Sequence, residues 1–215
     1  MTNQYKYGIY ILMEKQFNNK SFSVDPWGVI DKTLCESDSF KAIACACAKT
    51  EGHLLVVPTK RKIVAMAELS EKEYKELTDF ENHVASKLSK FYGGEIIIGE
   101  HGAGSNPLFR KGASNSIFEA HRHIAVLGNK VTVNDISEES EMKSISKWED
   151  FSKHFEKPYI FMNNKLTTKN MGRQYFPRKI AESFGLDYTI WQEADTKLIN
   201  LYKSNKSKME KIFGV

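Results

Sequence analysis

The stretch GHLLVVPTKRKIVAMAELSEKEYKEL, residues 52–77, determines the order of elements expected in this chain. Its first part, His53 to Val57, is apolar and ends at Pro58, which is typical of a β-strand. A helix is predicted over 70–92, because Ser70 and Glu73 form a capping box ahead of an apolar stripe. The stripe consists of Tyr74, Leu77, Phe80, Val84, Leu88 and Phe91. Gly93 and Gly94 then end the helix.

Other short apolar runs predict a mainly antiparallel sheet around this helix. Strands are expected at 7–17, on both sides of a turn at 50–52, at 95–99 and at 116–127, and the run 129–135 could add one more. A glycine-rich loop is expected over 100–115. This order predicts an α+β fold with an antiparallel sheet of about five strands. We expect a core domain over 1–135.

The chain changes character from about residue 136. Residues 137–157 are polar with a helical pattern, and 158–164 reads as a strand. Two helices are expected after it, one over 172–186 with Pro177 in its first turn and one over 191–213. We expect residues 136–215 to form a mixed extension that packs on the core.

Composition limits the classes of function. The 215 residues are 41% hydrophobic and 27% charged, with a formal net charge of +4. This mild excess makes nucleic acid an unlikely partner. Three cysteines without framework spacing, and no apolar segment long enough for a leader or a membrane span, favour the cytoplasm and exclude a membrane partner. No Cys-x-x-Cys is present, so we expect no structural zinc. We also expect no other metal and no cofactor.

Residues 116–128, SIFEAHRHIAVLG, hold the candidate chemistry. Residues two apart on a strand share a face, so Glu119, His121 and His123 lie in a row. The opposite face is apolar apart from Arg122 and should be the core side. Imidazoles act as nucleophiles and proton carriers near neutral pH, and two neighbouring rings resist being protonated together. The pattern alone fits a polar, non-catalytic strand face equally well.

The order of these segments resembles the histidine triad superfamily. The resemblance rests on Gly-His followed by Leu-Leu-Val-Val-Pro (52–58), the helix after it, the segment GGEIIIGEHGAGSN (93–106) and the strand with alternating histidines. It covers 35–128 well and the remainder loosely. It implies an active strand of the form His-x-His-x-His, whose middle histidine is the nucleophile.

Two registers of that motif are open. In one, His121 and His123 are the first and second histidines and Ala125 replaces the third. In the preferred one, Glu119 replaces the first histidine, His121 is the nucleophile and His123 contacts phosphate. Arg122 then stands where the family usually has an apolar residue.

The resemblance also implies ligand-binding residues. Ser116 would donate to the phosphoryl or leaving group, Asn115 would take a nearby polar position, and His53 would lie beside the active strand. His101, in the predicted loop, is a further binding candidate, and its alternative is simple solvent exposure. The segment before Gly52, IACACAKT, has no match for the family's acidic ribose ligand.

Basic residues at the start of the predicted helix 172–186 are the last candidates. Arg173, Gln174 and Arg178 could reach a phosphate from there, or could belong to a solvated basic face.

These expectations define the predicted function. The chain would be a nucleotidyl or phosphoryl hydrolase or transferase that acts on a nucleotide-type phosphoramidate or phosphoanhydride through phospho-His121, without a metal. Two alternatives remain: a non-catalytic protein that binds a nucleotide or phosphate ester, and a protein that binds a partner or nucleic acid through its basic last helix. The resemblance also implies a possible homodimer.

Overall fold

The computed structural model describes residues 33–45, 48, 50–102, 119–169, 171, 174–187 and 196–215. All of them belong to one compact unit, Thr33–Val215. The strand expected at 7–17 lies outside the described residues, as does most of the loop expected at 100–115. Within the described part, no helix is both long enough and apolar enough to cross a bilayer.

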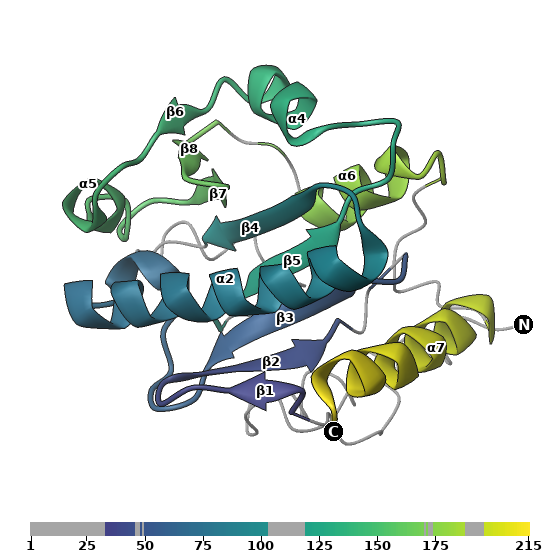
Figure 1. The fold of residues 1–215 in the computed structure, drawn as a ribbon. Coiled ribbons are helices and arrows are strands. Elements are labelled where there is room, and N and C mark those ends of the chain that lie inside the picture. Colours follow the sequence, from purple (N-terminus) through teal and green to yellow (C-terminus); the bar gives the residue numbers. More distant parts are fainter. Residues whose placement is uncertain are drawn as a thin grey trace, which may run out of the picture. The chain divides into compact units, whose positions relative to one another are not determined.

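The described strands form a single antiparallel sheet of eight strands in the order β1-β2-β3-β5-β4-β7-β8-β6 (Figure 1). Their bounds are β1 Cys35–Glu36, β2 Phe40–Ala44, β3 His53–Pro58, β4 Ile96–Gly102, β5 Arg122–Val126, β6 Lys143–Ser144, β7 Tyr159–Met162 and β8 Lys165–Thr167. The α+β class and the antiparallel sheet are confirmed. The sheet has eight strands rather than about five, because β6, β7 and β8 join it from the part of the chain after residue 136.

Helix α2, Glu71–Tyr92, packs against one face of the sheet at β2, β4 and β5 (Figure 1). Ser70 caps it as the sequence predicts: its hydroxyl accepts from the Glu73 backbone N–H. Phe91 departs from the predicted stripe, since its side chain is 59% exposed. At about 100° per residue, Tyr92 lies closer than Phe91 to the buried line through Leu88, and Tyr92 packs against the core instead.

Helix α6, Tyr175–Ser183, covers the opposite face and contacts β4 and β5. Ala125 and Ile97 are buried there in one apolar cluster with Phe176 and Ile180. Both faces of β5 are therefore covered, whereas the sequence suggested that only the Arg122 face was the core side. The difference arises because α6 comes from a distant part of the chain, which the pattern of a single strand cannot reveal.

Strand β4 continues to Gly102, so His101 lies in a strand rather than in the predicted loop. Its continuation follows from pairing with β7, in which His101 is opposite Ile160. Gly99 makes room for α6 on this strand, since a Cβ at this position would overlap the ring of Phe176. Gly102 is similarly covered by the ring of Tyr159.

The region after β5 contains one clear error of prediction. The strand considered at 129–135 is wrong: Val133–Glu139 form helix α4, which Thr132 caps by accepting from the Asp135 N–H at 3.2 Å. Residues 137–157 were expected to be helical, and they contain the end of α4, strand β6 and the short helix α5, Trp148–Ser152. The strand at 158–164 and the last two helices are present, as β7, α6 and α7, Thr196–Phe213.

Candidate functional site

Four histidines gather on the face of the sheet that α6 covers. The register places His53 opposite Ala125 and Gly99 opposite His123, so His53, His121 and His123 point to the same side. The ring centroids of His121 and His123 are 5.1 Å apart, as are those of His53 and His123. His101 lies close enough for its charge to act on His123.

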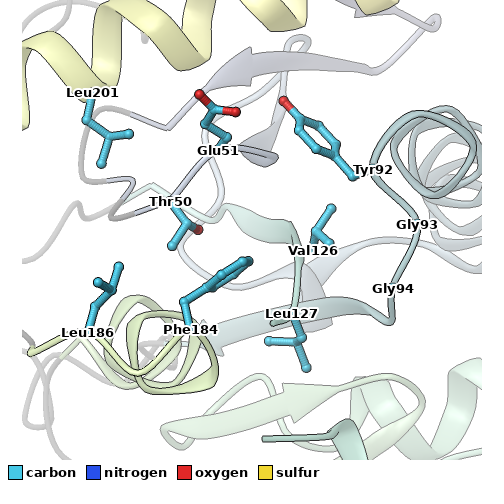
Figure 2. A pocket seen from close by; sticks show the side chains of 10 residues that line it. All are labelled: Thr50, Glu51, Tyr92, Gly93, Gly94, Val126, Leu127, Phe184, Leu186 and Leu201. Carbon is cyan, nitrogen blue, oxygen red and sulfur yellow. The ribbon is translucent and has the colours of Figure 1, made fainter. Parts of the chain in front are cut away.

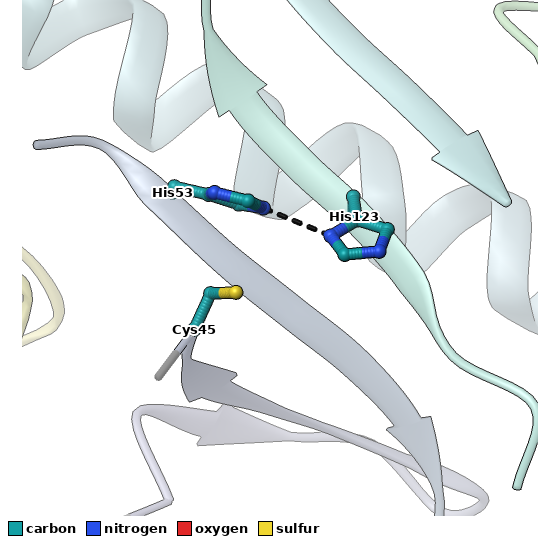
Figure 3. Close-up of side chains that lie close together, drawn as sticks. All are labelled: Cys45, His53 and His123. Carbon is teal, nitrogen blue, oxygen red and sulfur yellow. Dashed lines mark hydrogen bonds between the residues drawn. The ribbon is translucent and has the colours of Figure 1, made fainter. Parts of the chain in front are cut away.

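His53 and His123 are joined by a hydrogen bond between ring nitrogens. The Nε2 atom of His53 and the Nδ1 atom of His123 are 2.9 Å apart (Figure 3), and the side chains are 0% and 6% exposed. Burial, followed by the charge of His121, lowers the pKa of His53 to about 3. Burial and the neighbouring imidazoles also hold the pKa of His123 well below its usual range. Both rings are therefore neutral at pH 7.

His121 is held in one tautomer by the main chain. Its Nδ1 atom lies 2.9 Å from the carbonyl oxygen of Glu119. A carbonyl only accepts, so Nδ1 carries the proton and donates it. Burial lowers the pKa of His121, and the carbonyl and carboxylate of Glu119 act in the opposite direction. In its neutral form, His121 therefore has its lone pair on Nε2. A nucleophilic attack by this side chain would use that lone pair.

The carboxylate of Glu119 points to a lysine. It lies 3.2 Å from the Nζ atom of Lys62, whose side chain is 66% exposed. The backbone carbonyl of Glu119, rather than its carboxylate, accepts the hydrogen bond from His121. In the preferred register of the motif, the position of the first histidine would thus be taken by an acidic side chain in an ion pair with Lys62.

Arg122 points from β5 to the other face, beneath α2, and is fully buried. Its Nη1 atom donates to both carboxylate oxygens of Glu81, at 2.9 and 3.2 Å, and its Nε atom donates to Glu100 at 3.4 Å. The guanidinium lies 4.0 Å from the ring centroid of Phe161. The strand segment that holds both histidines is thereby tied to α2 and β4 by charges.

Two further donors complete this buried network. Glu100 Oε1 accepts from the Met66 N–H at 2.8 Å and from the Tyr159 hydroxyl at 2.7 Å. Burial raises the pKa of Glu81 to about 7 and also raises that of Glu100, although Arg122 opposes both shifts. One arginine thus balances one carboxylate, and the other carboxyl group readily holds a proton.

Sequence reasoning missed this network, although one signal was present. Glu81 lies on the apolar side of α2, four residues after Leu77 and three before Val84. A charged residue at such a position needs a buried partner, and Arg122, on the apolar face of its strand, is the matching charge.

The start of α6 lies beside the histidines. The ring centroid of Phe176, in the first turn of this helix, is 5.7 Å from that of His123. Gln174 is the N-cap residue and has a left-handed backbone, with φ of 54°. The unpaired N–H groups of a helix start favour anions such as phosphate.

Of the remaining predicted ligands, the structure describes Arg178. Arg178 donates to the Met171 carbonyl at 3.4 Å, and its guanidinium lies 5.9 Å from the ring centroid of Tyr175. Asn115, Ser116 and Arg173 lie outside the described residues.

A cavity of about 430 Å³ lies at the other end of β5 (Figure 2). Its lining includes Thr50, Glu51, Tyr92, Val126, Leu127 and Phe184. None of the predicted site residues lines it. The hydroxyl groups of Thr50 and Tyr92 have no hydrogen-bond partner in the described structure. This cavity is therefore separate from the histidine cluster.

Comparison with known proteins agrees with this arrangement. Residues 29–132, slightly less than half of the chain, match the family model of the HIT (histidine triad) domain. This part of the chain belongs to the histidine triad superfamily. No curated protein matches the chain significantly.

Several solved structures are similar to the chain at low identity. A histidine triad nucleotide-binding protein from Sulfolobus tokodaii is 13% identical, with 86% of this chain and 85% of that one covered and a TM-score of 0.42. A HIT-like protein from Bartonella henselae is 15% identical, with coverage of 66% and 94% and a TM-score of 0.39. A Streptococcus mutans protein is 20% identical at a TM-score of 0.37, with 46% of this chain and only 58% of that one covered.

Proposed function

We propose that this HIT protein is a nucleotidyl or phosphoryl hydrolase or transferase. Its substrate would be a nucleotide-type phosphoramidate or phosphoanhydride, and His121 would be the nucleophile. The observation that carries the proposal is the hydrogen bond from His121 Nδ1 to the Glu119 carbonyl, which leaves the lone pair on Nε2. The neighbouring ring of His123 adds support, because a neutral imidazole keeps one N–H group that can donate to a phosphoryl oxygen.

The reaction would proceed by double displacement. The Nε2 lone pair of His121 attacks phosphorus, a P–N bond forms, and the bond from phosphorus to the leaving nitrogen or oxygen breaks. The leaving group keeps the bonding electron pair and takes a proton from solvent. Water or another hydroxyl acceptor then attacks phosphorus, the pair of the P–N bond returns to Nε2, and the acceptor's proton goes to solvent. No metal or cofactor is needed in this scheme.

The other predicted residues would bind and orient the phosphate. We assign charge stabilisation to His123, Ser116 and the first turn of α6, which lies beside His123. His53 would orient the His123 ring through their shared hydrogen bond. Asn115, His101, Arg173, Gln174 and Arg178 remain candidates for contacts with the rest of the ligand.

A covalent adduct tests this function directly. The protein is mixed with adenosine 5′-phosphoramidate or diadenosine polyphosphate, quenched, and analysed by intact-mass and peptide mass spectrometry. We expect one nucleotidyl group on His121 and none in His121→Ala. His83, on the exposed side of α2, provides the matched control His83→Ala, which should react like the parent. Absence of adduct and turnover with both substrates, with His121→Ala indistinguishable from the parent, would contradict the proposal.

Glu119 favours a second candidate, a non-catalytic protein that binds a nucleotide or phosphate ester. It replaces the first histidine of the motif and pairs with Lys62. This candidate predicts saturable binding of AMP by calorimetry without turnover. The exchange Glu119→His separates the two functions, because a gain of turnover would identify a catalytic site altered by this single residue.

We propose further that the protein is cytoplasmic and that residues 136–215 are an extension packed on a core of 1–135. The pairing of β7 with β4 in one continuous sheet supports the packing of the extension on the core. A homodimer with a continuous sheet would have to use β1 or β6, the strands at the edges of the described sheet, and each has two residues. Light scattering during size-exclusion chromatography measures the oligomeric state.

A further inference from the structure

Three side chains of types that bind metal ions meet at three neighbouring strands of the sheet. Cys45 follows β2, His53 begins β3 and His123 lies in β5 (Figure 3). One ligand atom from each lies within 4.8 Å of the other two, and all three side chains are buried. Within the described ranges of the chain, no other three His, Cys, Asp or Glu side chains have their ligand atoms so close together.

The sheet register explains how they converge. The Cys45 N–H donates to the His53 carbonyl at 3.2 Å, which places these two residues side by side. His53 is opposite Ala125, and His123 lies two residues before Ala125 on the same face. The three ligands are far apart in the sequence. A search for short zinc-binding motifs such as Cys-x-x-Cys therefore does not detect them.

We propose that Cys45, His53 and His123 form a binding site for a thiophilic divalent cation of the Zn²⁺ class. One thiolate and two imidazoles are ligands that Zn²⁺ prefers, at about 2.3 Å for sulfur and about 2.0–2.1 Å for nitrogen. Tetrahedral angles at these lengths require the two ring nitrogens to be about 3.3 Å apart. His53 Nε2 and His123 Nδ1 are 2.9 Å apart, so the rings need to separate only slightly. The thiol would close the third side, and water would take the fourth position.

Binding has a defined proton balance. The Cys45 thiol loses its proton, and this proton is released. The proton shared between His53 and His123 moves to the outer nitrogen of one ring, so that both inner nitrogens offer lone pairs. Each ring stays neutral. One proton therefore leaves the protein for each cation that enters.

Cobalt(II) provides a direct spectroscopic test with the full-length protein after treatment with a chelator. We expect one equivalent of Co²⁺ to produce tetrahedral d–d absorption and a thiolate charge-transfer band, and Zn²⁺ to displace both. Cys45→Ser should remove the charge-transfer band. His53→Gln should weaken binding by more than about 100-fold, which is the upper range for loss of a residue that only orients a ligand. The matched control Cys35→Ser, half-buried in β1, should bind like the parent.

The absence of binding at one equivalent would overturn the site. A charge-transfer band that survives Cys45→Ser would also overturn it, for example a band that disappears in Cys47→Ser instead. If Cys45→Ser fails to fold, alkylation of the parent protein replaces it. Zn²⁺ should then slow labelling of Cys45 relative to Cys35 in peptide mass spectra, and equal labelling with and without Zn²⁺ would count against the site.

The cation should also oppose phosphate chemistry, and this consequence, unlike binding itself, rests on the proposed function. A cation at His123 Nδ1 reorients the ring that we assign to the phosphate. Zn²⁺ at ten times its Kd should therefore lower the rate of His121 adduct formation about tenfold, and a chelator should restore it. Failure of the proposed function would abolish the adduct in all samples but would leave the cobalt spectrum unchanged.

Discussion

The Nη1 atom of Arg122 lies 2.9 Å from the carboxylate of Glu81, and both side chains are almost completely excluded from water. Arg122 begins β5 and lies between His121 and His123 in the chain, while Glu81 lies in α2. The two faces of this short strand therefore have different tasks. One carries the histidines, and the other holds the strand to the long helix through a buried ion pair.

Arg122→Met should destabilise the protein strongly. The exchange leaves the carboxylates of Glu81 and Glu100 buried without their cation, and breaking a buried pair in this way costs about 3–5 kcal/mol. Chemical denaturation followed by circular dichroism measures the free energy of unfolding.

The triple exchange Glu81→Leu, Glu100→Gln and Arg122→Met serves as the control. It removes all the charges together but keeps an acceptor for the Met66 N–H and the Tyr159 hydroxyl. It should recover most of the stability, because apolar replacement of a whole buried charge network is often neutral or stabilising. A loss below about 1 kcal/mol in Arg122→Met alone would show that the network is not held together by charge.

The raised pKa of Glu81 predicts that the protein loses stability as the pH rises. The pKa of this carboxyl is about 7 in the fold and near its ordinary value in the unfolded chain. Between about pH 4.5 and pH 7, the folded protein thus binds more protons than the unfolded chain, and the free energy of unfolding falls by up to about 1.4 kcal/mol per pH unit from this group.

Glu81→Gln removes that titration but keeps an acceptor for Arg122. Its free energy of unfolding should therefore decline less than that of the parent from pH 5 to pH 7. Exposed Glu138 of α4 provides the control Glu138→Gln, whose pH dependence should match the parent. A parent protein that gains stability over this pH range, with Glu81→Gln unchanged in slope, would refute the assignment.

Asn205→Ala should loosen the last helix from the start of β3. Asn205 is fully buried in α7, where its Oδ1 atom accepts from the Gly52 N–H and its Nδ2 atom donates to the His53 carbonyl, both at 2.9 Å. Alanine leaves the Gly52 N–H without this partner, at about 1–3 kcal/mol for a buried unsatisfied group, while the His53 carbonyl keeps the Cys45 N–H as a donor. Thermal unfolding measures the loss, and exposed Lys203→Ala in the same helix should change stability by less than about 0.5 kcal/mol. Equal effects of the two exchanges would show that Asn205 is no anchor.

Sequence reasoning succeeded where a signal lies within one element. The capping box at Ser70 and the apolar run ending at Pro58 predicted α2 and β3, since both depend on neighbouring residues. Alternation also predicted that His121 and His123 share a face, and their ring centroids are 5.1 Å apart. The edge strands β1 and β6 have only two residues, too few for any periodicity to appear.

Features that depend on distant pairing were not predictable in this way. His101 was assigned to a loop because its strand structure depends on pairing with Ile160 of β7. This partner is distant in sequence and leaves no signal near His101. The α4 helix was mistaken for a strand because Val131 and Val133 alternate with polar residues, whereas Thr132 and Asp135 form the cap that decides the structure. The roles of Asn115, Ser116 and Arg173 stay predictions, since these residues lie outside the described ranges.

Gly99→Ala should displace α6 from the histidine face. Gly99 is opposite His123, and an added Cβ would overlap the ring of Phe176, which packs beside His123. Because the ring is fully buried, it cannot swing into solvent, and overpacking of this kind costs about 1–3 kcal/mol. The ring environment of His123 should change too, which histidine-selective NMR detects. The double exchange Gly99→Ala and Phe176→Leu gives the Cβ room, so it should be more stable than expected from the two single exchanges added together. Additive losses would mean that α6 does not rest on Gly99.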